Sequence, residues 1–86
     1  MKQETYNEAA SLQDVIRDAQ RQLDDANGCV TEITNVNPIK CDITIKVYDR
    51  DFYFRVSPAA TQCILTYVRV YHETRLSEAQ KNFDEL

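Results

Sequence analysis

The sequence has little of what usually interrupts or specialises a protein chain. Its 86 residues include one glycine, two prolines, one histidine and no tryptophan. Because glycine and proline are the main breakers of helices and strands, their scarcity predicts long regular elements. A single glycine also excludes a glycine-rich phosphate-binding loop, in which several glycines let the backbone approach a phosphate. One histidine and three widely spaced cysteines do not match the ligand patterns of zinc sites, so no metal or other cofactor is expected.

Long apolar runs and an excess of basic charge are also lacking. The longest uncharged stretch, residues 56–68, covers 13 residues, whereas a membrane-spanning helix needs about 20. The formal net charge is −4, so nucleic-acid binding, which depends on neutralising phosphates, is not expected. The first residues are polar, without the apolar run of a signal peptide, and the cysteine count is odd. We therefore expect reduced thiols in a cytoplasmic protein that has no membrane partner.

The residues that are present predict a small α+β protein. Hydrophobic residues make up 43% of the chain and charged residues 28%, a balance typical of globular proteins. At this length we expect a single domain over residues 1–86. Its expected elements are a long N-terminal helix, a three-stranded antiparallel sheet that contains a clear β-hairpin over 39–57, and a long C-terminal helix.

A heptad pattern predicts the first helix over residues 6–27. A capping box at Thr5 and Glu8 begins it, and Asn27-Gly28 provides a helix end. Its apolar residues recur at alternating spacings of three and four. Half of them are alanines, and such small side chains favour another helix as partner. This seam contains Ala9, Leu12, Ile16, Ala19, Leu23 and Ala26.

Strict alternation of apolar and polar residues predicts the hairpin. The strands are expected over 39–48 and 52–57, and a weaker pattern over 29–36 is interpreted as a third strand. Matching the two apolar faces places Tyr48 opposite Tyr53, Val47 opposite Phe54, and Lys46 opposite Arg55.

The polar face of this hairpin is the candidate ligand site. Lys46 opposite Arg55 is a like-charge pair that a bound anion would relieve. Tyrosines can stack on a base and arginines match phosphate oxygens, which favours a nucleotide-like ligand. The alternative is that neighbouring aspartates neutralise the pair. The candidate residues are Lys46, Tyr48, Arg50, Tyr53, Arg55 and Arg69.

The second helix is predicted over residues 58–85, with Ser57 as cap and Pro58 in the first turn. Its first half has a broad apolar face suited to covering the sheet, formed by Ala60, Cys63, Ile64, Tyr67, Val68 and Tyr71. Its second half continues as a narrow seam that contains Leu76, Ala79 and Phe83.

Burial of the two helical seams is the basis for an assembly prediction. Helices of this length extend beyond a small sheet, so we expect the seams to be buried in a homo-oligomer. The competing solution is an antiparallel pair of these helices within one chain. The predicted interface consists of Ala9, Leu12, Ile16, Ala19, Leu23, Leu76, Ala79 and Phe83.

The order of elements, in a short acidic chain, is similar to that of many small accessory proteins of phages and mobile elements. That resemblance implies a protein that binds and blocks, either as an inhibitor of an enzyme or as an oligomer that sequesters a nucleotide signal. We therefore expect a non-catalytic, homo-oligomeric binding protein, an inhibitor or accessory protein that acts on a protein partner. The alternative is a protein that sequesters an anionic nucleotide-like molecule on its hairpin. An enzyme is not expected, because no nucleophile motif accompanies the single histidine.

Overall fold

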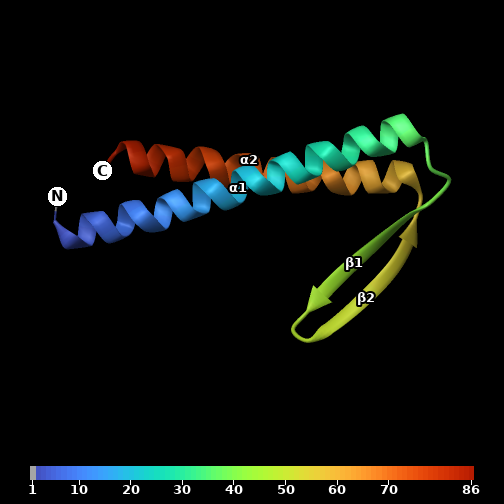
Figure 1. Cartoon of the computed structure of the whole chain (residues 1–86), viewed down its shortest axis with the longest axis horizontal. Helices are drawn as coiled ribbons and strands as arrows, with labels where there is room; N and C mark the ends of the chain where they lie inside the picture. Colours follow the sequence, from blue (N-terminus) through green and yellow to red (C-terminus); the bar gives the residue numbers. More distant parts are fainter. Residues whose placement is uncertain (1) are drawn as a thin grey trace.

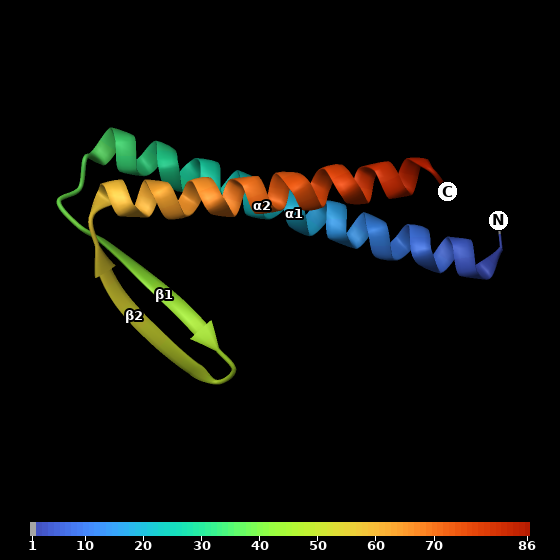
Figure 2. The same ribbon diagram turned by 180° about the vertical axis from the view of Figure 1, so that it is seen from behind.

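A computed structural model describes residues 2–86, so Met1, the first residue of the expected domain, lies outside the described residues. α1 spans Gln3–Val36, β1 Cys41–Val47, β2 Arg50–Val56 and α2 Pro58–Asp84. The two helices lie side by side and run antiparallel, and the β1–β2 hairpin projects from one end of the pair (Figures 1 and 2). The α+β class and the order helix, hairpin, helix are confirmed.

α1 is longer than predicted and includes the segment that was expected to form a third strand. It begins at Gln3, with Lys2 as N-cap, and not at the capping box of Thr5 and Glu8. It continues through Gly28 to Val36. The predicted helix end at Asn27-Gly28 and the predicted strand over 29–36 are therefore wrong, and the sheet in residues 2–86 has two strands.

The seam explains why the helix continues past Gly28. Its heptad spacing extends from Leu23 and Ala26 through Val30 to Ile33, and Ile33 is only 8% exposed. Burial of these side chains outweighs the penalty of about 1 kcal/mol for a glycine inside a helix. Tertiary packing thus overrides the local preference of Gly28.

Local hydrogen bonds then fix where the helices meet the hairpin. Asn37 ends α1 in the left-handed conformation, with φ 52°, and its N–H donates to the Ile33 carbonyl oxygen at 3.0 Å. At the start of α2, as predicted, Ser57 Oγ accepts the Ala60 N–H at 3.1 Å and Pro58 follows the cap. Only Ser57 separates β2 from α2, so this cap sets the direction in which the hairpin leaves the helix.

The α1–α2 seam is the core of the described residues. The intramolecular helix pair, which was the competing prediction, is the arrangement observed. Half of the buried side chains are alanines, so the two backbones approach closely while little apolar area is hidden. The buried residues are Ala19, Leu23, Ala26, Ile33, Thr61 and Ala79.

The hairpin closes through a two-residue turn, Tyr48-Asp49. The predicted register is therefore wrong, because Val47 pairs with Arg50, and Phe54 lies opposite Ile43. Two-residue turns are the commonest connection in hairpins.

The observed register also removes the expected like-charge pair. Lys46 lies opposite Asp51, and Arg55 lies opposite Asp42, so two pairs of opposite charge replace the predicted repulsion. Apolar residues still lie opposite apolar residues except next to the turn, where Val47 pairs with Arg50, because the two registers differ by an even number of positions.

The whole arrangement is one layer thick. The Cα atoms extend over 54 × 30 × 15 Å, and the radius of gyration is 16.7 Å, against roughly 12 Å for a compact chain of this length. The predicted covering of the hairpin by α2 is wrong within residues 2–86, because the hairpin extends away from the helices (Figure 1). Its apolar side is left without a second layer from these residues.

Gly28 gives a direct test of the long helix. A Cβ added at Gly28 meets nothing within 4 Å among the described residues. We expect Gly28→Ala to raise the free energy of unfolding by about 0.5–1 kcal/mol, because alanine is the better helix former. Urea unfolding followed by circular dichroism, at one protein concentration, measures this change. Ala10→Gly, at an exposed position of α1, is the control, and we expect it to lower the free energy of unfolding. A loss of stability in Gly28→Ala would contradict the continuous helix.

Candidate interaction surface

The apolar face of the hairpin is exposed in the half nearer the turn and half-buried at its base, where Cys41, Ile43 and Val56 lie. Ile45 and Phe54, from adjacent strands, are each 49% exposed. The residues that alternate toward this side of both strands include Arg50 at the turn end, and we call the apolar ones the hairpin apolar face: Cys41, Ile43, Ile45, Val47, Phe52, Phe54 and Val56.

A second exposed apolar surface follows α2. Helical spacing brings Ala60, Ile64, Tyr67 and Tyr71 onto one side of this helix, with Tyr67 80% exposed. These residues were predicted to cover the sheet, whereas Val68 of the same predicted face is half-buried. We call the exposed set the α2 outer stripe: Ala60, Cys63, Ile64, Tyr67, Val70 and Tyr71.

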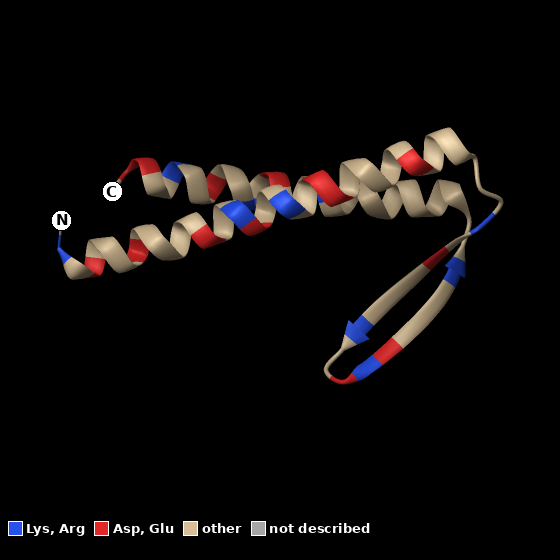
Figure 3. Cartoon of the chain, in the orientation of Figure 1, with Lys and Arg blue, Asp and Glu red and all other residues tan. Residues whose placement is uncertain are grey.

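Charge is placed away from the middle of both surfaces. Figure 3 shows the charged residues of the hairpin at its tip and near its base, with an uncharged stretch between them. The first three turns of α2, residues 58–68, contain no charged residue. Each surface therefore has an uncharged centre, as is typical of the centres of protein interfaces.

A cluster around Arg75 joins the two helices beside the α2 outer stripe. Arg75 Nη1 donates to Asp18 Oδ2 at 3.1 Å and to His72 Nδ1 at 3.0 Å, and its guanidinium lies 5.8 Å from the centroid of the Tyr71 ring. Since a guanidinium has no acceptor, Nδ1 must be the acceptor in this bond. His72 therefore accepts a hydrogen bond within this cluster.

The same cluster sets the electrostatics of Asp18. The hydrogen bond from Arg75 is the largest influence, and it holds the pKa of Asp18 below the ordinary value of 3.8. Desolvation, the next-largest influence, raises the pKa of Asp18, and the positive charges of Arg75 and Arg21 each lower it by a smaller amount. Asp18 also accepts a hydrogen bond from Arg21 Nη2 at 3.0 Å.

The polar face of the hairpin brings together only some of the predicted ligand-binding residues. Tyr53 and Arg55 line a hollow of about 310 Å³, together with Asp42 and Phe54. Arg55 Nε donates to Asp42 Oδ1 at 3.3 Å. A carboxylate inside the hollow reduces the positive potential that an anion would need there.

The other predicted ligand-binding residues are placed elsewhere. Tyr48 lies in the turn at the hairpin tip, 96% exposed and with φ 56°. Arg50 is on the opposite side of β2 from Tyr53, where its guanidinium lies 5.0 Å from the Phe52 ring centroid. Arg69 donates to Asn27 Oδ1 at 3.4 Å, on the helix pair.

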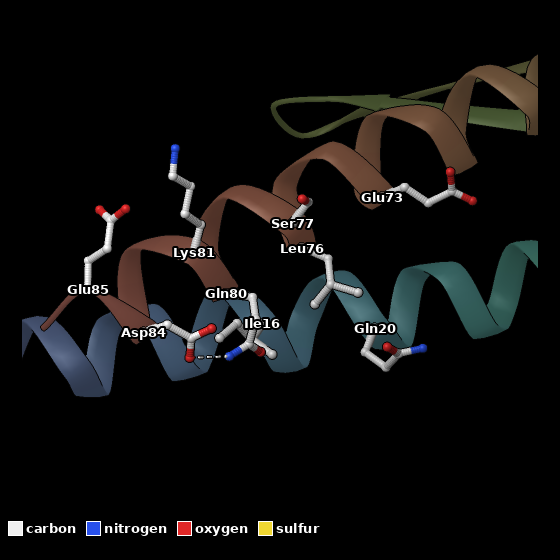
Figure 4. Close-up of a pocket in the computed structure, with 9 residues that line it drawn as sticks. All are labelled: Ile16, Gln20, Glu73, Leu76, Ser77, Gln80, Lys81, Asp84 and Glu85. Carbon is white, nitrogen blue, oxygen red and sulfur yellow. Dashed lines mark hydrogen bonds between the residues drawn. The ribbon is translucent and has the colours of Figure 1, made fainter.

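A groove of about 720 Å³ runs between the helices on the side shown in Figure 4. Two of the predicted interface residues, Ile16 and Leu76, provide its apolar part. Polar residues surround them, and Gln80 Nε2 donates to Asp84 Oδ1 at 3.1 Å.

The remaining predicted interface residues are divided between the seam and its free end. Ala19, Leu23 and Ala79 are buried in the seam within the chain. Leu12 is half-buried. Ala9 and Phe83 line a hollow of about 230 Å³ near the two termini. Sequence reasoning did not foresee that the hairpin apolar face would be exposed, because alternation shows that a face is apolar but not what covers it.

No family model matches this chain, and neither the curated proteins nor the solved structures contain a match. Among the helices of residues 2–86, none is long and apolar enough to cross a membrane. Within the same residues, no group of three histidine, cysteine or acidic side chains could hold a metal ion.

Asp18 predicts a pH dependence of stability. A carboxyl whose pKa is lowered by folding stabilises the protein above its unfolded pKa, and this contribution is lost as the pH falls through the lower folded value. We therefore expect Asp18→Asn to be less stable than wild type at pH 6, with a difference that shrinks as the pH is lowered below about 4. Urea midpoints measured between pH 2 and 6 give the comparison.

Asp14→Asn is the matched control. Asp14 lies one turn earlier and pairs at 3.6 Å with Arg17 of its own helix, in an exposed position. We expect it to change the pH dependence less than Asp18→Asn does. Equal profiles for the two variants would show that Arg75 does not stabilise Asp18.

Proposed function

We propose that this chain is a non-catalytic, homo-oligomeric binding protein that acts by contacting another protein. One observation carries the proposal: large apolar side chains of the hairpin and of α2, among them Ile45, Phe54 and Tyr67, are exposed, whereas half of the buried side chains are alanines. Contiguous apolar surface of this kind marks a protein–protein contact in soluble proteins.

The total surface area supports the same proposal. The accessible surface is 6819 Å², whereas a compact monomer of this mass exposes roughly 5,200 Å². The excess is roughly 1,600 Å² per chain, so two chains that hide it would bury roughly 3,200 Å² in total. Obligate homodimers bury about 2,000–5,000 Å².

The polar face of the hairpin gives less support to the alternative of an anion-binding protein. Arg55 is paired with Asp42, and Lys46 lies opposite Asp51. The cations that a phosphate would need are thus matched by carboxylates of the same hairpin.

The solvent face of α1 is the surface proposed for a different protein partner. Asp14, Asp24 and Asp25 are exposed on α1, where Asp14 pairs with Arg17 at 3.6 Å. Carboxylates arranged in this way favour a basic partner. An inhibitor or accessory protein that blocks such a partner is the class of function proposed.

Assembly is tested by light scattering after size exclusion, over a dilution series in the micromolar range. We expect wild type to have a multiple of the 10.0 kDa chain mass. Phe54→Ser should weaken assembly at least about tenfold, because burial of a phenylalanine contributes about 1.5–3 kcal/mol and 1.4 kcal/mol corresponds to a factor of ten. Tyr53→Ser, on the opposite face of the same strand, is the control that should leave assembly unchanged. A wild-type monomer at every concentration would refute the assembly part of the proposal.

Partner binding is tested by comparing captured proteins between wild type and a variant with Asp14→Lys, Asp24→Lys and Asp25→Lys. We expect a partner bound by wild type to be lost from this variant, because its charge complementarity is reversed. Gln13→Lys, an exposed change outside the carboxylate set, is the control. Equal capture by the charge-reversed variant would exclude this face.

A further inference from the structure

The two exposed apolar surfaces of the chain match each other in length and in charge. The hairpin apolar face follows strands of seven residues, a length of about 23 Å. The α2 outer stripe runs from Ala60 to Tyr71, about 17 Å along the helix axis. Both have uncharged centres (Figure 3). A sheet face of this size is wide enough to cover one helix of this length.

The hairpin does not cover the α2 outer stripe of its own chain. Ser57 is the single residue between β2 and α2, and its side chain is held by the bond from the Ala60 N–H at 3.1 Å. With this cap in place, the hairpin leaves α2 at an angle and extends away from the helix (Figures 1 and 2). Closing the angle within one chain would turn the backbone at this capped residue.

A second copy of the chain can cover the apolar surfaces that a single layer leaves exposed. A sheet or an amphipathic helix is stable only when its apolar face is covered by another layer. Two copies related by a two-fold axis place the same two surfaces against each other twice, so one contact type covers both. The excess area of roughly 1,600 Å² per chain suits such a double contact, because obligate homodimers hide about 1,000–2,500 Å² on each partner.

We propose that the chain forms a reciprocal dimer in which the hairpin apolar face of one copy covers the α2 outer stripe of the other. This inference rests on the proposed homo-oligomeric function and specifies which surfaces meet. In this dimer, α1 and α2 of each copy remain paired with each other, and the hairpin of each copy packs on α2 of the other copy. Cys63 lies on the α2 outer stripe, so the chain already has a thiol at the predicted contact.

Mixed cross-linking tests the contact directly. One preparation has Phe52→Cys, with Cys29, Cys41 and Cys63 replaced by serine. The other keeps Cys63, with Cys29 and Cys41 replaced by serine, and has a tag that changes its mass. The two are mixed, left to exchange and treated with a short bis-maleimide, and circular dichroism confirms that both are folded. We expect a mixed product that joins the two different chains.

Tyr53→Cys replaces Phe52→Cys in the control, since Tyr53 is on the opposite face of the same strand. The mixed product should then fall several-fold. A chain that has both Phe52→Cys and Cys63 provides a second measurement, in which the proposed dimer gives a linked species of twice the chain mass.

The other outcomes overturn the inference in distinguishable ways. Products that join only identical single-cysteine chains would show that two hairpins, or two α2 outer stripes, contact each other. This result would refute the reciprocal contact, although the protein would still be a homo-oligomer. A link within one chain, together with a 10.0 kDa mass in solution, would refute both the dimer and the proposed assembly. An oligomer without any mixed product would also refute the contact between hairpin and stripe.

Discussion

The antiparallel seam between α1 and α2 is the constraint on which the rest of the structure depends. Because Ala19, Ala26 and Ala79 form much of it, the helix backbones lie close together, and the seam hides little apolar area. Small side chains fit two helices well but cannot provide the interior of a whole protein. Apart from Leu23 and Ile33, which are buried in the seam, many of the larger apolar residues lie exposed on the hairpin and on the free side of α2.

Two short connections give those outer residues their direction. Asn37 ends α1 in the left-handed conformation, and the Ser57 cap begins α2 directly after β2. Both connections favour one backbone path through side-chain or backbone hydrogen bonds, so the hairpin is held away from the helices. Beside the α2 outer stripe, Arg75 bonds Asp18 of α1 and His72 of α2, which ties the helices together where that stripe ends. The α2 outer stripe is thus part of a helix that is bonded to α1 through Arg75.

This arrangement favours function through contact. In the proposed assembly, a second copy covers the two exposed apolar surfaces of this elongated layer, and the charged face of α1 stays available to the proposed protein partner. The polar face of the hairpin is less suited to binding an anion, because Lys46 and Arg55 each lie opposite an aspartate of the same hairpin. The register of the two strands decides which charged residues lie opposite each other. The error in the predicted register therefore led to the expectation of a like-charge pair that the hairpin does not have.

The sequence by itself determined the elements whose signals are local and periodic. Strict alternation identified both strands of the hairpin, Ser57-Pro58 located the start of α2, and the heptad spacing identified the seam at Ala19 and Leu23. It placed the surface left for a partner on the helical seams, whereas Ala19, Leu23 and Ala79 of those seams are buried within the chain. Tertiary structure decided the rest. Burial of Ile33 favours the continuation of α1 past Gly28, although Asn27-Gly28 taken locally predicts a helix end. The choice of a two-residue turn fixed the charge pairs, because both registers satisfy the same alternation. Whether the hairpin covers its own helix was decided by the backbone direction at Ser57, a three-dimensional property that no periodicity in the sequence encodes.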